Sequence, residues 1–128
     1  MSENTNGQFC WNELITSDTA GAKSFYTELF GWKADDMDMG EMVYTMFMDP
    51  NGQEGPEGMI GGMIQSPMPE IPPHWLSYVM VEDVAASLEK AESLGATAIK
   101  GVTELPMGTF AIFKDPQGAV IALWKKKG

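Results

Sequence analysis

The sequence predicts an α+β domain built from two tandem βαβββ units. Three pairs of landmarks recur in the same order: an aspartate suited to cap a helix (Asp18 and Asp83), a glycine suited to end one (Gly31 and Gly95), and an Asp-Pro-x-Gly turn. The members of these pairs lie 65, 64 and 66 positions apart. Because the separation is nearly constant over three different features, it indicates an internal duplication.

The first unit opens with a strand that leads into a helix. Phe9–Thr16 is short, aromatic and β-branched, and Asp18 follows it with a carboxylate that can accept hydrogen bonds from free backbone N–H groups. Apolar residues then recur at the spacing of one helical face: Ala22, Phe25, Tyr26, Leu29 and Phe30. Gly31 can adopt the left-handed conformation that commonly ends a helix.

Three short strands are expected to complete the first unit. Lys33–Met37 is a weak strand candidate, and Tyr44–Phe47 is a stronger one because of its aromatic residues. The turn Asp49–Gly52 carries proline and glycine where a tight turn requires them, and the apolar strand Met59–Ile64 follows.

The second unit begins with the same order of strand and helix. Trp75–Val81 is an apolar strand candidate, Asp83 is a plausible helix cap, and Gly95 is suited to the helix end. The residues between them form a helical stripe: Val84, Leu88, Ala91 and Leu94. This stretch therefore predicts a second helix.

Three strands again follow the helix. They are expected at Thr97–Lys100, at Phe110–Phe113 and at Val120–Trp124, with the turn Asp115–Gly118 between the last two. Each has a counterpart in the first unit, so the same βαβββ order is predicted twice.

Four prolines in residues 66–73 predict an extended linker between the units. We therefore expect a single domain, with the first unit at about residues 7–65, the linker at 66–73 and the second unit at about 74–125. One helix on a small sheet cannot cover both faces of that sheet. The units are expected to pair as half-barrel sheets around a concave cup, which would be the ligand site.

The composition indicates a globular protein of 128 residues with a formal net charge of −10. This charge disfavours binding to nucleic acid or to an anionic membrane surface. No stretch approaches the roughly 20 apolar residues of a membrane span. The N-terminal residues lack the features of a signal peptide, which favours the cytoplasm, and Cys10 is expected to be a small buried hydrophobe.

Several of these motifs together resemble a known superfamily. Asp18, then Phe25-Tyr26 and Leu29–Trp32, and much later Asp115–Gly118 with a final strand, are similar to the vicinal-oxygen-chelate superfamily of glyoxalases, bleomycin-resistance proteins and extradiol dioxygenases. The resemblance runs from about residue 9 to residue 124. It implies the paired βαβββ fold. The Pro-Pro-His-Trp start of the second unit resembles a branch described as related to lactoylglutathione lyase.

The resemblance also allows a test for the metal site of that superfamily. Its metal-dependent members place one ligand near the start of each unit's first strand and one on its last strand, usually His or Glu. The corresponding positions here are Trp11, Leu76, Ala122 and either Gly61 or Gly62. None of these side chains can bind a metal, so we expect neither the usual metal site nor another cofactor.

Polar side chains near these positions are candidates for chemistry. Residues two apart on a strand share a face, so Glu13 is expected to point into the cup beside Trp11. By the same rule, His74 and Tyr78 point the same way as Leu76. The expected ligand-binding lining of the cup also includes Leu76, Ala122 and Trp124. A carboxylate in an apolar strand needs a donor or a raised pKa, and such a group suits a general base or the binding of a cationic ligand group. The alternative is that Glu13 bonds only structural partners.

The remaining candidates each have a structural alternative. His74 suits an acid or base but also a linker, because it follows two prolines. Trp11 and Trp124 offer aromatic area to a planar ligand or to a core. Gly61-Gly62 permits close backbone approach or marks a bulge. Alternation places Trp75 against a helix rather than in the cup.

Three functions remain open from the sequence. The first is metal-independent binding of a small planar or amphipathic organic ligand in the apolar cup. The second is a lyase or isomerase reaction with Glu13 as base and Tyr78 or His74 assisting. The third is a metal-dependent lyase or dioxygenase reaction with rearranged ligands, Glu13 and His74. Because two-unit members of the resembled superfamily commonly pair, a homodimer is also expected.

Overall fold

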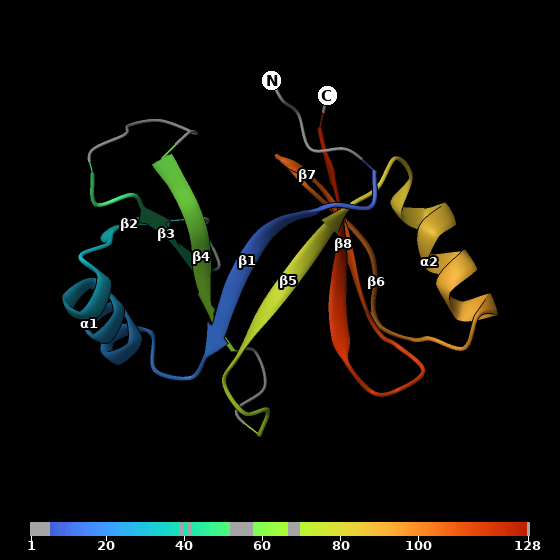
Figure 1. Cartoon of the computed structure of the whole chain (residues 1–128), viewed down its shortest axis with the longest axis horizontal. Coiled ribbons are helices and arrows are strands. Elements are labelled where there is room, and N and C mark those ends of the chain that lie inside the picture. Colours follow the sequence, from blue (N-terminus) through green and yellow to red (C-terminus); the bar gives the residue numbers. More distant parts are fainter. Residues whose placement is uncertain (1–5, 39, 41, 52–57, 67–69, 128) are drawn as a thin grey trace. The chain divides into compact units, whose positions relative to one another are not determined.

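The computed structural model describes residues 6–38, 40, 42–51, 58–66 and 70–127. In this part of the chain it contains eight strands and two helices, in the predicted order βαβββ-βαβββ (Figure 1). Their bounds are β1 Phe9–Thr16, α1 Thr19–Phe30, β2 Lys33–Asp38, β3 Val43–Met48, β4 Met59–Gln65, β5 His74–Met80, α2 Val84–Ser93, β6 Thr97–Leu105, β7 Gly108–Lys114 and β8 Val120–Lys126. The α+β class and the repeated order of elements are confirmed.

Both helices begin at the predicted aspartates. The carboxylate of Asp18 accepts a hydrogen bond at 2.9 Å from the backbone N–H three residues later, and Asp83 does the same at 3.0 Å. Gly31 ends α1 in the left-handed conformation, with φ 75°. Leu94 is the C-cap residue of α2, and Gly95, which follows it, has φ 108°. Side-chain capping and glycine conformation therefore set the limits of both helices.

Each of the two Asp-Pro turns contains the same type of local hydrogen bond. The carboxylate of Asp49 accepts from the backbone N–H of Asn51 at 2.8 Å, and that of Asp115 accepts from Gln117 at 2.9 Å. Gly118 has φ 101°, as a turn glycine requires. Gly52, its expected counterpart, lies outside the described residues.

The chain forms two compact units, which we name after their helices. The α1 unit is Asn12–Trp75, and the α2 unit is Met1–Trp11 together with Leu76–Gly128. The strand β1 therefore contributes its first residues to the α2 unit and its remainder to the α1 unit. Within the α2 unit, the backbone N–H of Met80 donates to the carbonyl of Gln8 at 2.8 Å.

Each unit has a mixed sheet with one helix-covered face. In the α1 unit, β4 pairs with β1 in parallel and with β3 in antiparallel fashion, and β2 follows β3. In the α2 unit, β8 pairs with β5 in parallel and with β7 in antiparallel fashion, and β6 follows β7. The buried core residues of the α1 unit are Leu14, Phe47 and Met63, and those of the α2 unit are Val81, Val84, Leu88, Ala111 and Leu123.

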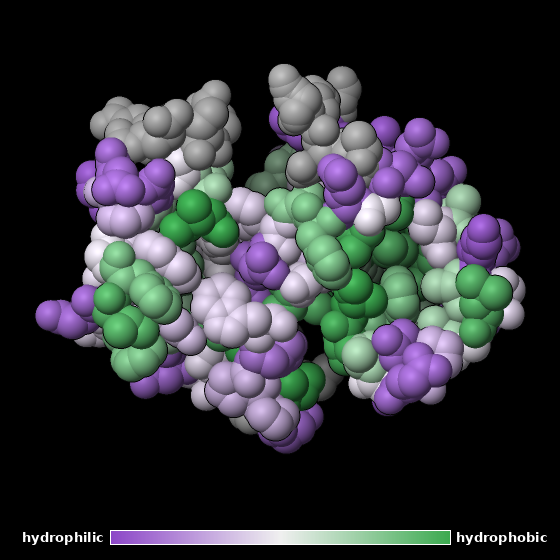
Figure 2. All heavy atoms as spheres, viewed as in Figure 1, coloured by the Kyte–Doolittle hydropathy of each residue, from purple (hydrophilic) through white to green (hydrophobic). Residues whose placement is uncertain are grey.

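The apolar stripe expected on α1 is only partly buried. Ala22 and Tyr26 pack against the core of the α1 unit, whereas Phe25, Leu29 and Phe30 are 58%, 57% and 51% exposed. Figure 2 shows apolar side chains at the outer surface of this helix. Helical periodicity correctly assigns these residues to one side of the helix. The periodicity does not indicate how much of that side the sheet covers, and in the structure the sheet contacts only a narrow strip of it.

The strand β6 is longer than predicted, because it continues from Lys100 to Leu105. Its pairing with β7 shifts register on both sides of Lys100, so the strand passes through irregular pairing and then resumes. Among the described residues, no helix has the length and apolar character needed to cross a membrane.

Candidate functional site

The α1 unit has a second sheet face, on the side away from α1. Leu14, Phe47 and Met63 lie under the helix, so the residues that alternate with them face the other way. On that side, Gly62 is paired with Glu13 on β1 and with Met46 on β3. Three adjacent strands thus form one row of residues across the sheet.

Glu13 occupies this row with a buried side chain that is only 7% exposed. On its face of β1, Glu13 lies between the apolar residues Trp11 and Ile15, because residues two apart on a strand share a face. Among the described residues, no buried side-chain nitrogen or oxygen lacks a hydrogen-bond partner. The carboxylate is therefore accommodated by polar contacts, as its burial requires.

Tyr44 covers Gly62 on this face, although no motif in the sequence marks it as a site residue. A Cβ atom placed on Gly62 would lie 2.8 Å from Cε2 of Tyr44 and closer still to its hydroxyl group. A side chain at position 62 and the present Tyr44 ring therefore cannot coexist. The pairing irregularity of β3 and β4 lies between Phe47 and Met48, directly beside Gly61, which pairs with Phe47. Gly62 thus makes room for the Tyr44 ring, whereas Gly61 borders the bulge that was the alternative expected for the glycine pair.

The α2 unit carries an aromatic cluster on its sheet face away from α2. Tyr78 and Trp124 have ring centroids 6.4 Å apart, and Tyr78 and Phe110 have centroids 6.5 Å apart. Tyr78 is buried, whereas the other two rings are half-buried. A Cβ atom on Gly108 would lie 2.6 Å from the Trp124 indole, so this glycine makes room for the indole ring. We call Tyr78, Phe110 and Trp124 the aromatic cluster.

The two units repeat one row of residues across their sheets. The α2 unit pairs Tyr78 with Ala122, and Ala122 with Ile112. This row matches the row of Glu13 and Gly62 in the α1 unit, since both rows cross the first, last and third strands of their unit. Gly62, rather than Gly61, is therefore the structural counterpart of Ala122.

These positions offer no donor set for the metal of the resembled superfamily. Gly62 and Ala122 carry no ligating atom, and neither do Trp11 and Leu76, which lie two residues before Glu13 and Tyr78 on their strands. The described residues also contain no group of three His, Cys, Asp or Glu side chains placed to hold a metal ion. The residues at these positions do not fit the usual metal centre.

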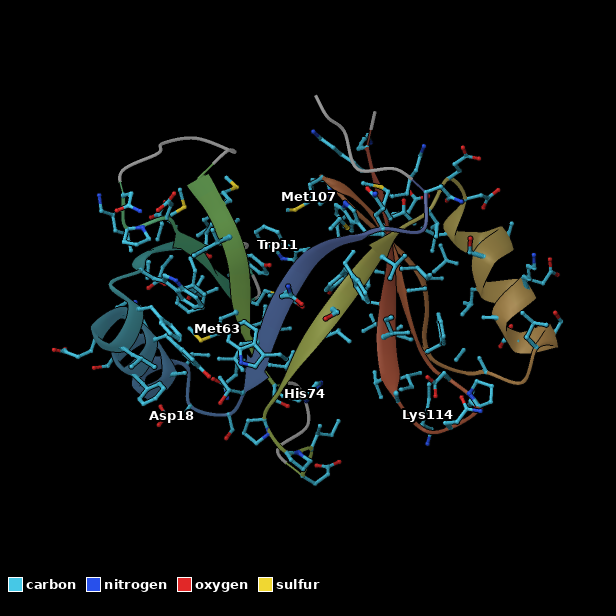
Figure 3. The ribbon with its side chains drawn as sticks, in the orientation of Figure 1. Trp11, Asp18, Met63, His74, Met107 and Lys114 are labelled. Atoms are coloured by element: carbon cyan, nitrogen blue, oxygen red, sulfur yellow. The ribbon has the colours of Figure 1, made fainter. Side chains whose placement is uncertain are left out.

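His74 and Trp75 begin β5 with different surroundings. Nδ1 of His74 lies 3.0 Å from the backbone carbonyl oxygen of Pro72, which orients the ring beside the linker (Figure 3). Trp75 contacts α1, since its indole N–H donates to the hydroxyl of Tyr26 at 3.3 Å. The expected placement of Trp75 against a helix is confirmed. Trp32 also packs at the end of α1, with its ring centroid 4.9 Å from that of Phe30.

Cys10 and Asp36, both among the described residues, have shifted pKa values with clear causes. Cys10 is half-buried rather than buried as expected, and this partial burial raises the pKa of its thiol, which disfavours the reactive thiolate. The pKa of Asp36 is lowered by the hydrogen bond from Lys23, at 2.7 Å, and then by that from Thr45. The Asp36 side chain lies on the sheet face that α1 covers, so its ion pair with Lys23 links β2 to α1. Glu13 lies on the opposite face of the same sheet.

Comparisons with known proteins agree with the repeated fold. The family model of the Glyoxalase/Bleomycin resistance protein/Dioxygenase superfamily matches residues 8–123. The chain is 32% identical over 123 residues to "Putative glyoxylase CFP32" of Mycobacterium tuberculosis, which covers 95% of this chain and 45% of that protein. It is 31% identical over 141 residues to the anthracycline biosynthesis protein DnrV of Streptomyces peucetius, covering 98% of this chain and 50% of that protein. The chain thus spans about half the length of these curated relatives.

Solved structures share the fold at low sequence identity. Methylmalonyl-CoA epimerase from Mycobacterium tuberculosis aligns with a TM-score of 0.63 and 12% identity, over 100% of this chain and 93% of that one. The Mn(II)-bound glyoxalase from Novosphingobium aromaticivorans aligns with a TM-score of 0.62 and 15% identity, over 96% of this chain and 40% of that one. The family match over nearly the whole chain carries the assignment: the chain belongs to the glyoxalase/bleomycin resistance protein/dioxygenase superfamily.

Proposed function

We propose that the chain binds a small, planar organic ligand at the aromatic cluster of the α2 unit, without a metal ion. One observation carries the proposal: three aromatic side chains from β5, β7 and β8 gather on the sheet face that α2 leaves uncovered. Buried Leu76 and Ala122 supply apolar surface from the same face. Ring contacts stabilise a planar partner by about 0.5–1.5 kcal/mol each beyond their buried area.

The ligand class is also supported by a relative. One curated relative is named for anthracycline biosynthesis, and anthracyclines contain a planar fused-ring system. The absence of donor atoms at Trp11, Gly62, Leu76 and Ala122 supports binding by shape and stacking rather than by chelation. Elemental analysis of untagged protein tests the metal-free part, because a stoichiometric transition metal would contradict it.

A titration with anthraquinone sulfonate tests the aromatic cluster directly. This planar probe is an anion, so a protein of net charge −10 does not attract it through non-specific electrostatics. Isothermal titration calorimetry is expected to show saturable binding. The substitution Trp124→Leu is expected to raise the dissociation constant by about 2- to 10-fold. Trp75→Leu is the matched control, since Trp75 lies against α1 and belongs to the other unit. Equal affinities for the two variants would reject the aromatic cluster as the binding site.

Proton transfer by Glu13 is a second candidate function, favoured by the burial of this carboxylate. A buried base beside a bound substrate could abstract an acidic C–H proton in a lyase or isomerase reaction. The test is exchange of substrate C–H for deuterium in heavy water by the wild type, Glu13→Gln and the exposed control Glu28→Gln. A base predicts loss of exchange with preserved affinity in Glu13→Gln alone. Exchange that survives this substitution would exclude Glu13 as the base.

The roles of His74 and Tyr78 as assisting groups, and the homodimer, stay predictions. Sedimentation analysis of the purified chain measures the oligomeric state. His74→Asn and Tyr78→Phe in the same exchange assay measure the assisting roles.

A further inference from the structure

We infer that Tyr44 is the positioning residue of Glu13: its hydroxyl group, held over Gly62, orients the neighbouring carboxylate. The inference deepens the proposed role of Glu13 as a base and depends on that role for its functional meaning. Its structural content is independent of any ligand. It is carried by strand register, by the space over Gly62 and by the burial of Glu13.

The strand register places the two side chains on one face. Gly62 pairs with Glu13 on one side and with Met46 on the other. Tyr44 precedes Met46 by two residues on β3, so it points to the same side of the sheet. That side is the one turned away from α1.

The Tyr44 ring then crosses β3 toward β4. The hydroxyl oxygen and Cε2 of Tyr44 occupy the space that a Cβ of Gly62 would need. Neighbouring strands are about 4.8 Å apart, so a group above Gly62 is within reach of a side chain that starts at Glu13. The absence of a side chain at Gly62 is what lets the phenol approach the carboxylate.

The phenol group of Tyr44 is chemically suited to donate a hydrogen bond to the carboxylate of Glu13. The two strands that follow β1 across this sheet, β4 and β3, carry no titratable side chain other than Tyr44. A phenol O–H donates one hydrogen bond, and a carboxylate accepts it most strongly when ionised. Such a donor keeps a buried carboxylate charged and fixes its orientation, which a base needs before substrate arrives.

The pKa of Glu13, followed through its carboxyl carbon by NMR, tests the inference in the ligand-free protein. Tyr44→Phe removes only the hydroxyl group, and we expect the pKa of Glu13 to rise by about one pH unit. Tyr26→Phe is the matched control, because it deletes a hydroxyl group on the α1 side of the same unit. An unchanged pKa in Tyr44→Phe, or an equal rise in Tyr26→Phe, would overturn the inference.

A reciprocal measurement covers the case in which Tyr44→Phe folds poorly. Glu13→Gln removes the negative charge beside the phenol, so the pKa of Tyr44 is expected to fall in an ultraviolet titration. No change in Tyr44 ionisation would overturn the inference as well. Neither measurement uses substrate. A failed exchange assay would therefore reject Glu13 as a base and leave the Tyr44–Glu13 pairing to be judged separately.

Discussion

The close contact between Gly62 and Tyr44 makes a quantitative prediction about stability. Gly62 is not among the described glycines with positive φ, so alanine is compatible with its backbone. Alanine at a compatible site ordinarily stabilises by about 0.4–1 kcal/mol, through the unfolded chain. Here the new Cβ would overlap the phenol of Tyr44, which must move out of its packed position. Overpacking of this kind costs about 1–3 kcal/mol.

Urea denaturation of Gly62→Ala measures this cost. Gly101→Ala is the matched control, because a Cβ there meets nothing within 4 Å and the backbone also lacks a positive φ. The control is expected to be as stable as the wild type or slightly more so. Gly62→Ala is expected to have a lower midpoint at an unchanged slope.

A double-mutant cycle identifies the source of the loss. In a Tyr44→Ala background the clashing ring is absent, so Gly62→Ala should cost much less than it does in the wild type. Two results would refute the reasoning. One is equal stability of Gly62→Ala and Gly101→Ala, and the other is the same loss with and without the Tyr44 ring.

Three further predictions concern the scaffold of the α1 unit and its repeat. Phe47→Ala should lower the free energy of unfolding by about 3–5 kcal/mol in urea, because Phe47 is fully buried in the core; a loss below about 1 kcal/mol would contradict that packing. Asp18→Ala and Asp83→Ala should each cost about 1 kcal/mol by the same assay, since both cap a helix, and a neutral result would deny the cap. The pKa of Asp36 is lower in the folded state than its unfolded-state value of about 3.9, so its ion pair with Lys23 stabilises the fold at pH values above about 3.9. This stabilisation is lost as the pH falls through the folded-state pKa of Asp36. Because both side chains are partly exposed, the difference from Asp36→Asn should stay below about 1 kcal/mol and shrink in salt; a pH-independent difference would contradict the assignment.

Local signals in the sequence were sufficient to predict the order of the elements. Asp18, Gly31 and Asp83 act through short-range capping and backbone conformation, which depend on the residue itself and its nearest neighbours. The burial of Glu13 and the placement of Trp75 against a helix were also predictable, because strand alternation is a local property.

Features that depend on contacts between strands were not predictable in this way. Tyr44 covers Gly62 because of the register of β3 and β4 and the direction of one ring, and neither is encoded by spacing along one strand. The same limit applies to Phe25 on α1, whose exposure depends on how much of the helix the sheet reaches. The aromatic cluster joins Phe110 to Tyr78, a contact that no pattern in the sequence indicates because the two residues lie on different strands.

The indole N–H signals of the four tryptophans provide the most direct test of ligand binding at the aromatic cluster. In a ¹⁵N-labelled sample each signal can be assigned by a Trp→Phe substitution and followed during titration with anthraquinone sulfonate. Binding at the aromatic cluster predicts a saturable shift of the Trp124 signal, with the signals of Trp32 and Trp75 unchanged. A saturable shift of Trp75 without Trp124, or no shift of any indole signal, would contradict the account.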